Sequence, residues 1–500
     1  NALALMDFQI SMVTVDTTGR RAHDIFWLTD RDGAKVTAEN RQHELTTAVI
    51  LVKHFTHLLP HSPNPESALL HFRELLGELM RRENWMHELA SLERPEVLAR
   101  VARLLGVSDF LWDDFLRLQY DSLFPLVSDI NELRLVKNRE ALRSELRSEL
   151  GQAQDDAARI DALNRFKDRE IFRIDLRHIH ELVPEFTHFA LELTDLADVV
   201  LVEAIELAIA RVAAQLGDAP QPSRWCLSAL GKCGGREMGY ASDIELIFVY
   251  EASDALAGVF YQQVVTELLN VIRSRQAGIF TIDLQLRPYG SAGSLAVSLE
   301  SFRTYYAPTG PAWPYERQAL IKLRPLAGDE ALCSTLTALR DEYLYQSGAV
   351  DLPAVRAMRE RQVRNLVQGG TINIKFSPGG TVDAEYLVQI LQLAYGASRP
   401  ELRRTNTFEA IDALLSAGLI QTAQHNALVD AYMLLRRTVD ALRMVRGNTF
   451  DLTVPEVHTD EFAYLARRLG LGHDTAAYYA RLVEAIRTIL ALQNSLWAGL

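Results

Sequence analysis

Apolar residues recur every three or four positions over most of the chain, which is the pattern of amphipathic helices. The pattern is nearly unbroken over residues 38–216 and again over residues 350–500. One clear example is the apolar stripe made by Leu98, Val101, Leu104 and Leu105, which is followed by Gly106. We therefore expect two mainly helical regions.

Strand-like alternation of apolar and polar residues marks the start of the chain. Residues 7–15 and 24–30 are expected to be strands, with turns at 16–19 and 31–33. A helix should begin near Thr37. The order strand, turn, strand, helix is half of a small α/β sandwich, and an unrelated hairpin followed by a helix is the alternative.

Short apolar runs typical of a compact α/β unit fill residues 221–335. Strands are expected at Trp225–Leu230, Ile244–Tyr250 and Phe280–Leu286. The helix expected between the last two carries one apolar side, made by Phe260, Val264, Leu268 and Val271. The predicted fold is mainly α with an inserted α/β domain. Its expected domains are residues 1–50, 51–220, 221–335 and 345–500.

Charge and composition narrow the classes of function. The formal net charge of −13 disfavours general binding to nucleic acid or to an anionic membrane. Only three cysteines occur and no long apolar run suggests a membrane span, so a reduced, cytoplasmic protein is expected. The charge-dense residues 131–170 are expected to form a solvated helix face or an exposed helical hairpin, and not a binding tail.

Acidic residues on two of the expected strands are the main candidates for chemistry. Asp243 and Glu245 are two positions apart, so they point to one face of their strand, about 6–7 Å apart along it. Alternation likewise places Asp283, Gln285 and Arg287 on one face of the third strand. If the two strands pair, three carboxylates converge, which suits divalent metal ions that bind a triphosphate. Exposed strand acids without a function are the alternative.

Glycines directly before these acids favour a phosphate site. Gly231, Gly234 and Gly235 would let the backbone approach a phosphate and present N–H groups to it. Arg236 beside them is a candidate phosphate partner.

Three further segments are weaker candidates. The glycine-bearing loop 287–294 follows the third acid, and Arg317, Lys322 and Arg324 gather basic charge further on. Residues 374–386 form a glycine turn that enters a helix with two acids. A plain loop, a solvated helix face and ordinary helix capping are the respective alternatives.

At four of these segments the chain resembles the glutamine synthetase adenylyltransferases, which belong to the DNA polymerase β-like nucleotidyltransferases. The segments, in the order and spacing of that family, are GKCGGREMGYASDIELIFVYE, IDLQLRPYGSAGSLAVSLESFRTYY, WPYERQALIKLRPLAGD and IKFSPGGTVDAEYLVQILQLAYG. The similarity extends from about residue 90 to about residue 490.

The resemblance implies transfer of AMP from ATP to a tyrosine of glutamine synthetase, or its removal by phosphorolysis. It implies Mg²⁺ or Mn²⁺ ligands at Asp243, Glu245 and Asp283. Its nucleotide-binding turn matches Gly231, Gly234, Gly235 and Ser242, and its basic positions match Arg287, Lys322 and Arg324.

Two departures from the family pattern leave alternatives open. The family usually has Asp-x-Asp where this chain has Asp243-x-Glu245, and it usually carries two catalytic units where this chain has one. A weakened regulatory module that binds nucleotide or glutamine synthetase is one alternative, and a nucleotidyltransferase with another acceptor is a second.

The first 50 residues contain an apolar strand followed by a spaced set of residues, Gly19, Ala22, Asp24, Phe26, Thr29, Asp30 and Gly33. In this pattern they resemble the last part of an ACT domain, a ligand-sensing module also found in PII uridylyltransferases. Glutamine at this segment and a PII-type signal protein are therefore candidate partners beside glutamine synthetase. Nucleic acid and membrane are not expected as partners.

Overall fold

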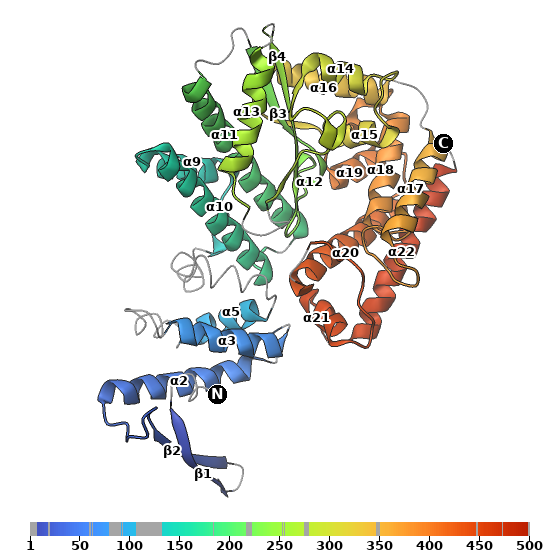
Figure 1. Ribbon diagram of the computed structural model, residues 1–500. Helices are drawn as coiled ribbons and strands as arrows, with labels where there is room; N and C mark the ends of the chain where they lie inside the picture. Colours follow the sequence, from blue (N-terminus) through green and yellow to red (C-terminus); the bar gives the residue numbers. More distant parts are fainter. Residues whose placement is uncertain are drawn as a thin grey trace. The chain divides into compact units, whose positions relative to one another are not determined.

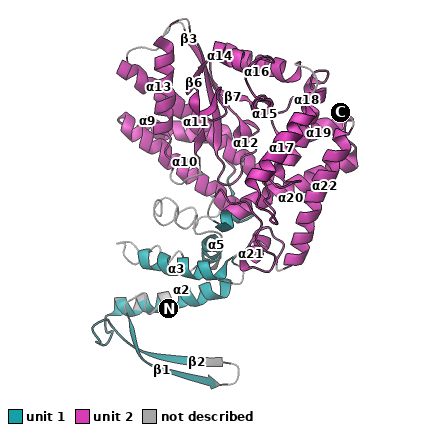
Figure 2. Cartoon of the chain, turned by 45° about the vertical axis from the view of Figure 1, so that its right-hand side comes forward, with its two compact units in different colours: residues 1–135, 179–182, 444–447 teal, residues 136–178, 183–443, 448–500 magenta. Residues whose placement is uncertain are grey.

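The computed structural model describes residues 8–18, 21–59, 62, 64–79, 92, 94–106, 133–183, 185–216, 223–252, 254, 256–274, 280–346, 351–446, 449–472 and 474–498. The chain divides into two compact units, which Figure 2 colours separately. Unit 1 consists of Asn1–Leu135, Ile179–Leu182 and Met444–Gly447, and unit 2 consists of Val136–His178, Val183–Arg443 and Asn448–Leu500. The domain boundaries expected from the sequence remain predictions.

Unit 1 begins with an antiparallel hairpin of β1 (Gln9–Thr18) and β2 (Arg21–Thr29). The expectation of a turn at residues 16–19 was wrong, because Asp16 pairs with His23 and the ladder continues to Thr18. Apolar side chains remain exposed along both strands. The strand–strand–helix order is as expected, and the likeness to an ACT domain stays a prediction.

The helices of unit 1 are α2 (Glu39–Leu58), α3 (Pro65–Leu79) and α5 (Pro95–Leu105). Phe55 of α2 and Phe72 of α3 stack with their ring centroids 3.8 Å apart. The predicted apolar stripe before Gly106 is confirmed, since all its members are buried on α5.

Unit 2 contains long helices, a mixed sheet and a helical bundle (Figure 1). Its elements up to residue 345 are α9 (Arg139–Gln152), α10 (Asp156–Ile179), α11 (Phe186–Leu216), β3 (Ser223–Ala229), α12 (Gly231–Gly234), β4 (Ile244–Ala252), α13 (Leu256–Val271), β5 (Ile282–Asp283), η2 (Gly290–Ala292), β6 (Ala296–Ser298), α14 (Leu299–Tyr306), α15 (Pro314–Ala319), η3 (Leu320–Lys322), β7 (Arg324–Gly328) and α16 (Glu330–Tyr345). The predicted fold class, mainly α with an inserted α/β domain, is confirmed.

The expectation of a solvated charge-dense face over residues 131–170 was wrong for α10. Lys167 and Glu170 are each only 1% exposed there. Glu170 accepts hydrogen bonds from Lys137 at 2.9 Å and from Arg173 at 2.6 Å. Opposite charges on neighbouring turns and segments therefore let this helix bury charged residues.

The sheet has the order β5-β4-β3-β7, and β6 also pairs with β4. Strand β3 is antiparallel to β4 and β7, whereas β4 is parallel to β5 and β6. Phe248 of β4 lies 5.4 Å from the ring of Tyr261 on α13, while Ile247 packs into the cluster that contains α14 and α16. Because helices cover both faces, β4 reads as a continuous apolar run.

The third expected strand is much shorter than predicted. Strand β5 contains only Ile282 and Asp283, and the chain turns at Gln285. The expected alternation of Asp283, Gln285 and Arg287 on one face was therefore wrong. Strands β6 and β7 were not predicted.

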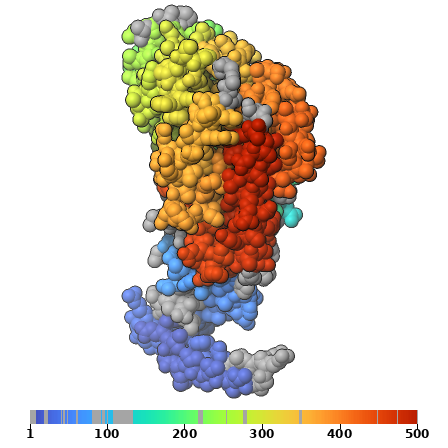
Figure 3. All heavy atoms as spheres, turned by 90° about the vertical axis from the view of Figure 1, so that its right-hand side faces the viewer, coloured from blue at the N-terminus to red at the C-terminus, as the bar shows by residue number. Residues whose placement is uncertain are grey.

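The C-terminal part of unit 2 is helical, as expected. Its elements are α17 (Leu352–Leu366), α18 (Thr381–Tyr395), η4 (Pro400–Leu402), α19 (Thr407–Ser416), α20 (Thr422–Arg446), α21 (Asp460–Arg468) and α22 (Thr475–Trp497). Figure 3 shows α22 in red at the surface of this unit, beside orange segments. No helix in the described ranges has the length and apolar character needed to cross a membrane.

Candidate functional site

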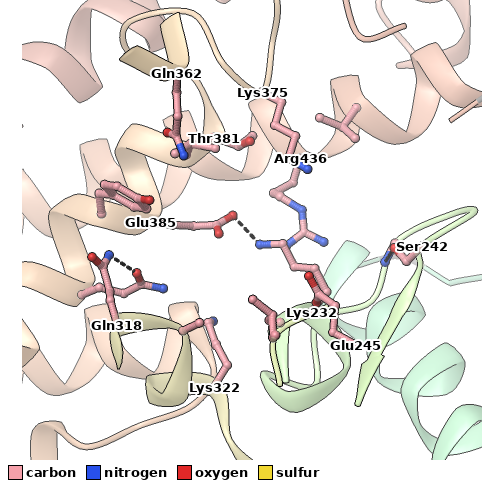
Figure 4. A pocket seen from close by; sticks show the side chains of 18 of the residues that line it. Lys232, Ser242, Glu245, Gln318, Lys322, Gln362, Lys375, Thr381, Glu385 and Arg436 are labelled. Atoms are coloured by element: carbon pink, nitrogen blue, oxygen red, sulfur yellow. Dashed lines mark hydrogen bonds and ion pairs between the residues drawn. The ribbon is translucent and has the colours of Figure 1, made fainter. Parts of the chain in front are cut away.

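A cleft of about 390 Å³ opens within unit 2 between the α/β domain and the C-terminal helices (Figure 4). The α/β domain contributes α12, the start of β4, α15 and η3, and the bundle contributes α17, α18 and α20. Of the residues predicted to form the site, Gly231, Ser242, Glu245 and Lys322 line this cleft. Those that do not line it are Gly234, Gly235, Arg236, Asp243, Asp283, Arg287 and Arg324.

The three predicted acids are neighbours at the start of β4. Glu245 pairs in register with Asp283 of the parallel strand β5, and Asp243 directly precedes β4. Burial raises the pKa of Glu245, although Lys375 and Lys232 oppose the shift. Asp243 keeps access to solvent, yet partial burial raises its pKa as well, and Asp283 adds to the shift in both acids.

The predicted glycine turn is one turn of helix, α12. Gly234 and Gly235 use their N–H groups inside this turn, as donors to the carbonyl oxygens of Leu230 and Gly231. The glycines instead allow close packing, because a Cβ at Gly231 would overlap the carboxylate of Glu245. Gly231 also has φ = +50°, a conformation that favours glycine.

Lys232 of α12 joins the α/β domain to the bundle. Its ammonium group forms an ion pair with Glu385 of α18 and donates to the hydroxyl of Tyr432 of α20 at 3.1 Å. Tyr432 in turn donates to Glu385 at 3.0 Å. Figure 4 shows the Lys232–Glu385 pair across the middle of the cleft.

The carboxylate of Glu237 lies among positively charged side chains behind this pair. Its carboxylate bonds to Lys322 and to the hydroxyl of Thr407, which donates at 3.0 Å, and Arg436 donates to its carbonyl oxygen at 2.6 Å. Burial alone would raise the pKa of Glu237, but Lys232, Lys322 and Arg436 outweigh it and hold the pKa at about 2. The result is a network of ion pairs and hydrogen bonds around a buried carboxylate.

The basic residues predicted to bind nucleotide are held by protein groups. Arg324 binds Asp198 through two 2.8 Å hydrogen bonds, and Arg236 donates to Asp195 at 2.7 Å. Arg287 donates to carbonyl oxygens of its own loop, including that of Leu284 at 2.7 Å. The side chain of Ser242 accepts a hydrogen bond from the N–H of Gly239 at 2.9 Å.

Two cations that sequence reasoning did not assign to the site face the acids. Lys375 lines the cleft. Its ammonium group lies 5.0 Å from the ring centroid of Phe376 and forms no hydrogen bond or ion pair with another side chain of the described part. Burial lowers its pKa with help from Arg443, while Glu385 and Glu245 oppose the shift. Arg443 donates to the carbonyl oxygen of Tyr240 at 2.8 Å, and its buried Nε has no hydrogen-bond partner in the described ranges.

The signal for Lys375 and Glu385 was present in the glycine segment 374–386, for which capping was the alternative explanation. Capping holds for Asp383, which accepts from the N–H of Gly379 at 2.7 Å and from Arg359 at 2.6 Å. Glu385, two residues later, instead belongs to the cleft.

The fold and the cleft together define the class of this protein. It is a mainly helical chain with an inserted α/β domain, and the acids of that domain face cations from a helical bundle. A model of the family "Glutamate-ammonia ligase adenylyltransferase" matches residues 98–338, and a model described as "GlnD PII-uridylyltransferase" matches residues 354–497. Residues 98–338 of the chain belong to the glutamine synthetase adenylyltransferase family.

Curated relatives agree with this assignment. The chain is 29% identical to the bifunctional glutamine synthetase adenylyltransferase/adenylyl-removing enzyme of Cutibacterium acnes over 84% of its length, which is 42% of that protein. It is 31% identical to the protein of the same name from Chromobacterium violaceum over 78% of its length, or 43% of that protein. The chain thus spans about two fifths of the length of these relatives.

Proposed function

We propose that this chain is a nucleotidyltransferase that moves AMP from ATP to a tyrosine of glutamine synthetase, or removes it by phosphorolysis, and so acts in the control of nitrogen assimilation. The observation that supports this most is the register of β4 and β5, which puts Asp283 beside Glu245 and next to Asp243. The names of the relatives supply the acceptor and the two directions.

The donor chemistry of these acids fits a hard divalent cation such as Mg²⁺ or Mn²⁺. Asp283 is near enough to raise the pKa of both other acids, and a cation would relieve that repulsion. In the described residues, no three His, Cys, Asp or Glu side chains already form a ready metal-binding group. Asp243, Glu245 and Asp283 would hold the metal, which would neutralise phosphate charge and acidify the acceptor hydroxyl.

In the forward reaction, the tyrosine oxygen forms a bond to the α-phosphorus and the bond to the β-phosphate oxygen breaks, which releases pyrophosphate. Asp283 is the candidate to accept the phenolic proton. Lys375 and Arg443 place positive charge opposite the acids, where a polyphosphate would need it. Removal of AMP is a separate phosphorolysis: an oxygen of inorganic phosphate forms a bond to the α-phosphorus, the bond to the tyrosine oxygen breaks, and ADP and the protonated tyrosine are released.

The decisive experiment is to incubate the protein with ATP labelled at the α-phosphate, Mg²⁺ or Mn²⁺, and glutamine synthetase, with and without glutamine. Label should move to the synthetase and should be lost with Asp243→Asn or Asp283→Asn. Glu300→Gln, at an exposed position of α14, is the matched control and should transfer normally. Equal transfer by the Asp243 variant and the control would refute the assignment.

A regulatory module that binds nucleotide or the synthetase without turnover is the second candidate. Two observations favour it: Glu245 stands where an aspartate is usual, and Lys322 and Arg324 are held by internal partners. Calorimetry separates the two candidates, because binding of Mg-ATP without transfer to any acceptor supports the module. Binding of glutamine or of a PII-type protein in the same experiment would identify the further partners.

A further inference from the structure

Neutral amides and phenols gather toward one end of the cleft. Gln318 and Tyr315 lie on α15, Gln362 on α17, and Tyr386 and Gln389 on α18. In Figure 4, Gln318 and Gln362 lie on one side of the Lys232–Glu385 pair, and Ser242 and Glu245 lie on the other. Lys322 lies on the same side as Gln318 in Figure 4, but its ammonium group bonds to Glu237 and to the hydroxyl of Thr407.

Two of the amides form a buried pair with a donor and an acceptor to spare. Gln318 donates from Nε2 to Oε1 of Gln389 at 2.6 Å, and the two residues are only 5% and 9% exposed. Neither Oε1 of Gln318 nor Nε2 of Gln389 has a hydrogen-bond partner in the described part of the chain. One acceptor and one donor are left whichever way the amides are turned. Such a pair is complementary to the edge of a purine.

Gln362 lies beside the phenol of Tyr386. Burial raises the pKa of Tyr386, and the side chain of Gln362 opposes the shift. Oε1 of Gln362 is buried and has no hydrogen-bond partner in the described residues. A buried acceptor without a partner favours a ligand with an N–H donor at that point.

An aromatic surface completes this end of the cleft. Tyr315 lines the cleft and is 44% exposed, so its ring is available for contact. Bases stack on such rings whatever their identity. Stacking alone would accept any base, so the choice among bases must come from the amides.

We propose that Gln318, Gln389 and Gln362, with Tyr315 as the stacking surface, bind the nucleobase of the nucleotide and select adenine through its exocyclic amino group. The proposal rests on the proposed function for its assumption that a nucleotide enters this cleft. Adenine offers an amino donor beside a ring-nitrogen acceptor, whereas guanine and hypoxanthine present a carbonyl oxygen in place of that amino group.

The first test uses the unmodified protein and needs no substitution. Calorimetry with ATP, ITP and inorganic tripolyphosphate, each with Mg²⁺, should give an affinity for ATP that exceeds that for ITP by roughly tenfold or more, since ITP has a carbonyl oxygen and a protonated ring nitrogen where ATP has the amino group and an acceptor nitrogen. Equal affinities for ATP and ITP would overturn the choice of base. Equal affinities for ATP and tripolyphosphate would overturn the subsite as a whole.

The second test locates the subsite. Gln389→Leu and Gln362→Leu should each weaken ATP binding by roughly tenfold or more and leave tripolyphosphate binding unchanged. Gln362→Leu should also remove the preference over ITP. The matched control is Gln263→Leu, at an exposed position of α13 outside the cleft. Unchanged ATP affinity in both cleft variants would contradict the proposal.

The outcomes separate this proposal from the proposed function. If ATP binds with the expected preference but no AMP reaches any acceptor, the subsite stands and the transferase assignment fails. If AMP is transferred but the Gln389 and Gln362 variants keep the affinity and preference of the unmodified protein, the assignment stands and the subsite fails.

Discussion

Glu237 and Lys322 form an ion pair that is buried at both ends, with side chains that are 2% and 7% exposed. The pair lies behind the cleft, and Thr407 of the bundle bonds to both members. Lys322 was expected to bind nucleotide, and in this structure its charge is balanced by protein groups. The pair thus fixes the η3 segment against α19.

Loss of Glu237 should strongly destabilise unit 2. Glu237→Ala would leave Lys322 and Arg436 as buried cations without their carboxylate, and breaking such a pair costs about 3–5 kcal/mol. Urea denaturation followed by tryptophan fluorescence should show this loss. Glu300→Ala, at an exposed position, should change the free energy of unfolding by less than about 0.5 kcal/mol. Similar losses in the two variants would argue against the network.

The same carboxyl predicts a pH dependence. The pKa of Glu237 falls from its ordinary value of 4.5 to about 2 in the folded protein. Its stabilisation is therefore complete above about pH 4.5 and is lost as pH falls toward 2. The stability difference between the unmodified protein and Glu237→Gln should shrink over this window by up to about 3 kcal/mol. A difference that stays constant from pH 5 to pH 2 would contradict the low pKa.

Lys375 and Lys322 should behave in opposite ways when replaced. Lys375 forms no ion pair with another described residue, so Lys375→Met should leave the melting temperature nearly unchanged and weaken tripolyphosphate binding by roughly tenfold. Lys322→Met should lower the melting temperature, because Glu237 loses its closest cation. Thermal melting and calorimetry on the two variants check this contrast. The reverse pattern would show that Lys322 is the phosphate ligand.

Gly231→Ala should remove activity with little change in fold. The added methyl group would overlap the Glu245 carboxylate and displace it, and the residue has φ = +50°. AMP transfer should fall by roughly a hundredfold or more, because small shifts of catalytic groups are costly. Gly369→Ala is the control, since its Cβ would meet no atom within 4 Å. Equal activity in the two variants would mean that Glu245 need not stay where it lies.

The pairing of the acids could be predicted from the sequence because it depends on local patterns. Apolar runs identified β4 and the position of β5, and parallel pairing of the two strands placed Asp283 beside Glu245. The end of β5 could not be predicted in this way. The guanidinium group of Arg287 donates to carbonyl oxygens of its own loop, and the alternation of apolar and polar residues gives no sign of these hydrogen bonds.

The partners of the basic residues could not be predicted from the sequence for a different reason. Arg324 bonds to Asp198, which lies 126 positions away, and Lys322 bonds to Glu237, which lies 85 positions away. Contacts at such separations depend on how helices pack, and periodicity records only which face is buried. The buried charges of α10 were missed for the same reason, because a lysine such as Lys167 is expected to be solvated when its neighbours in the fold are not known.

The cleft is assembled from two stretches of sequence that the family models also separate. All three acids lie within residues 98–338, whereas Lys375, Gln362 and Gln389 lie within residues 354–497. Under the proposed assignments, the reacting groups and most of the wall that selects the base therefore lie in stretches that two different family models match. A relative that shares only the first stretch could keep the reaction and use another nucleotide.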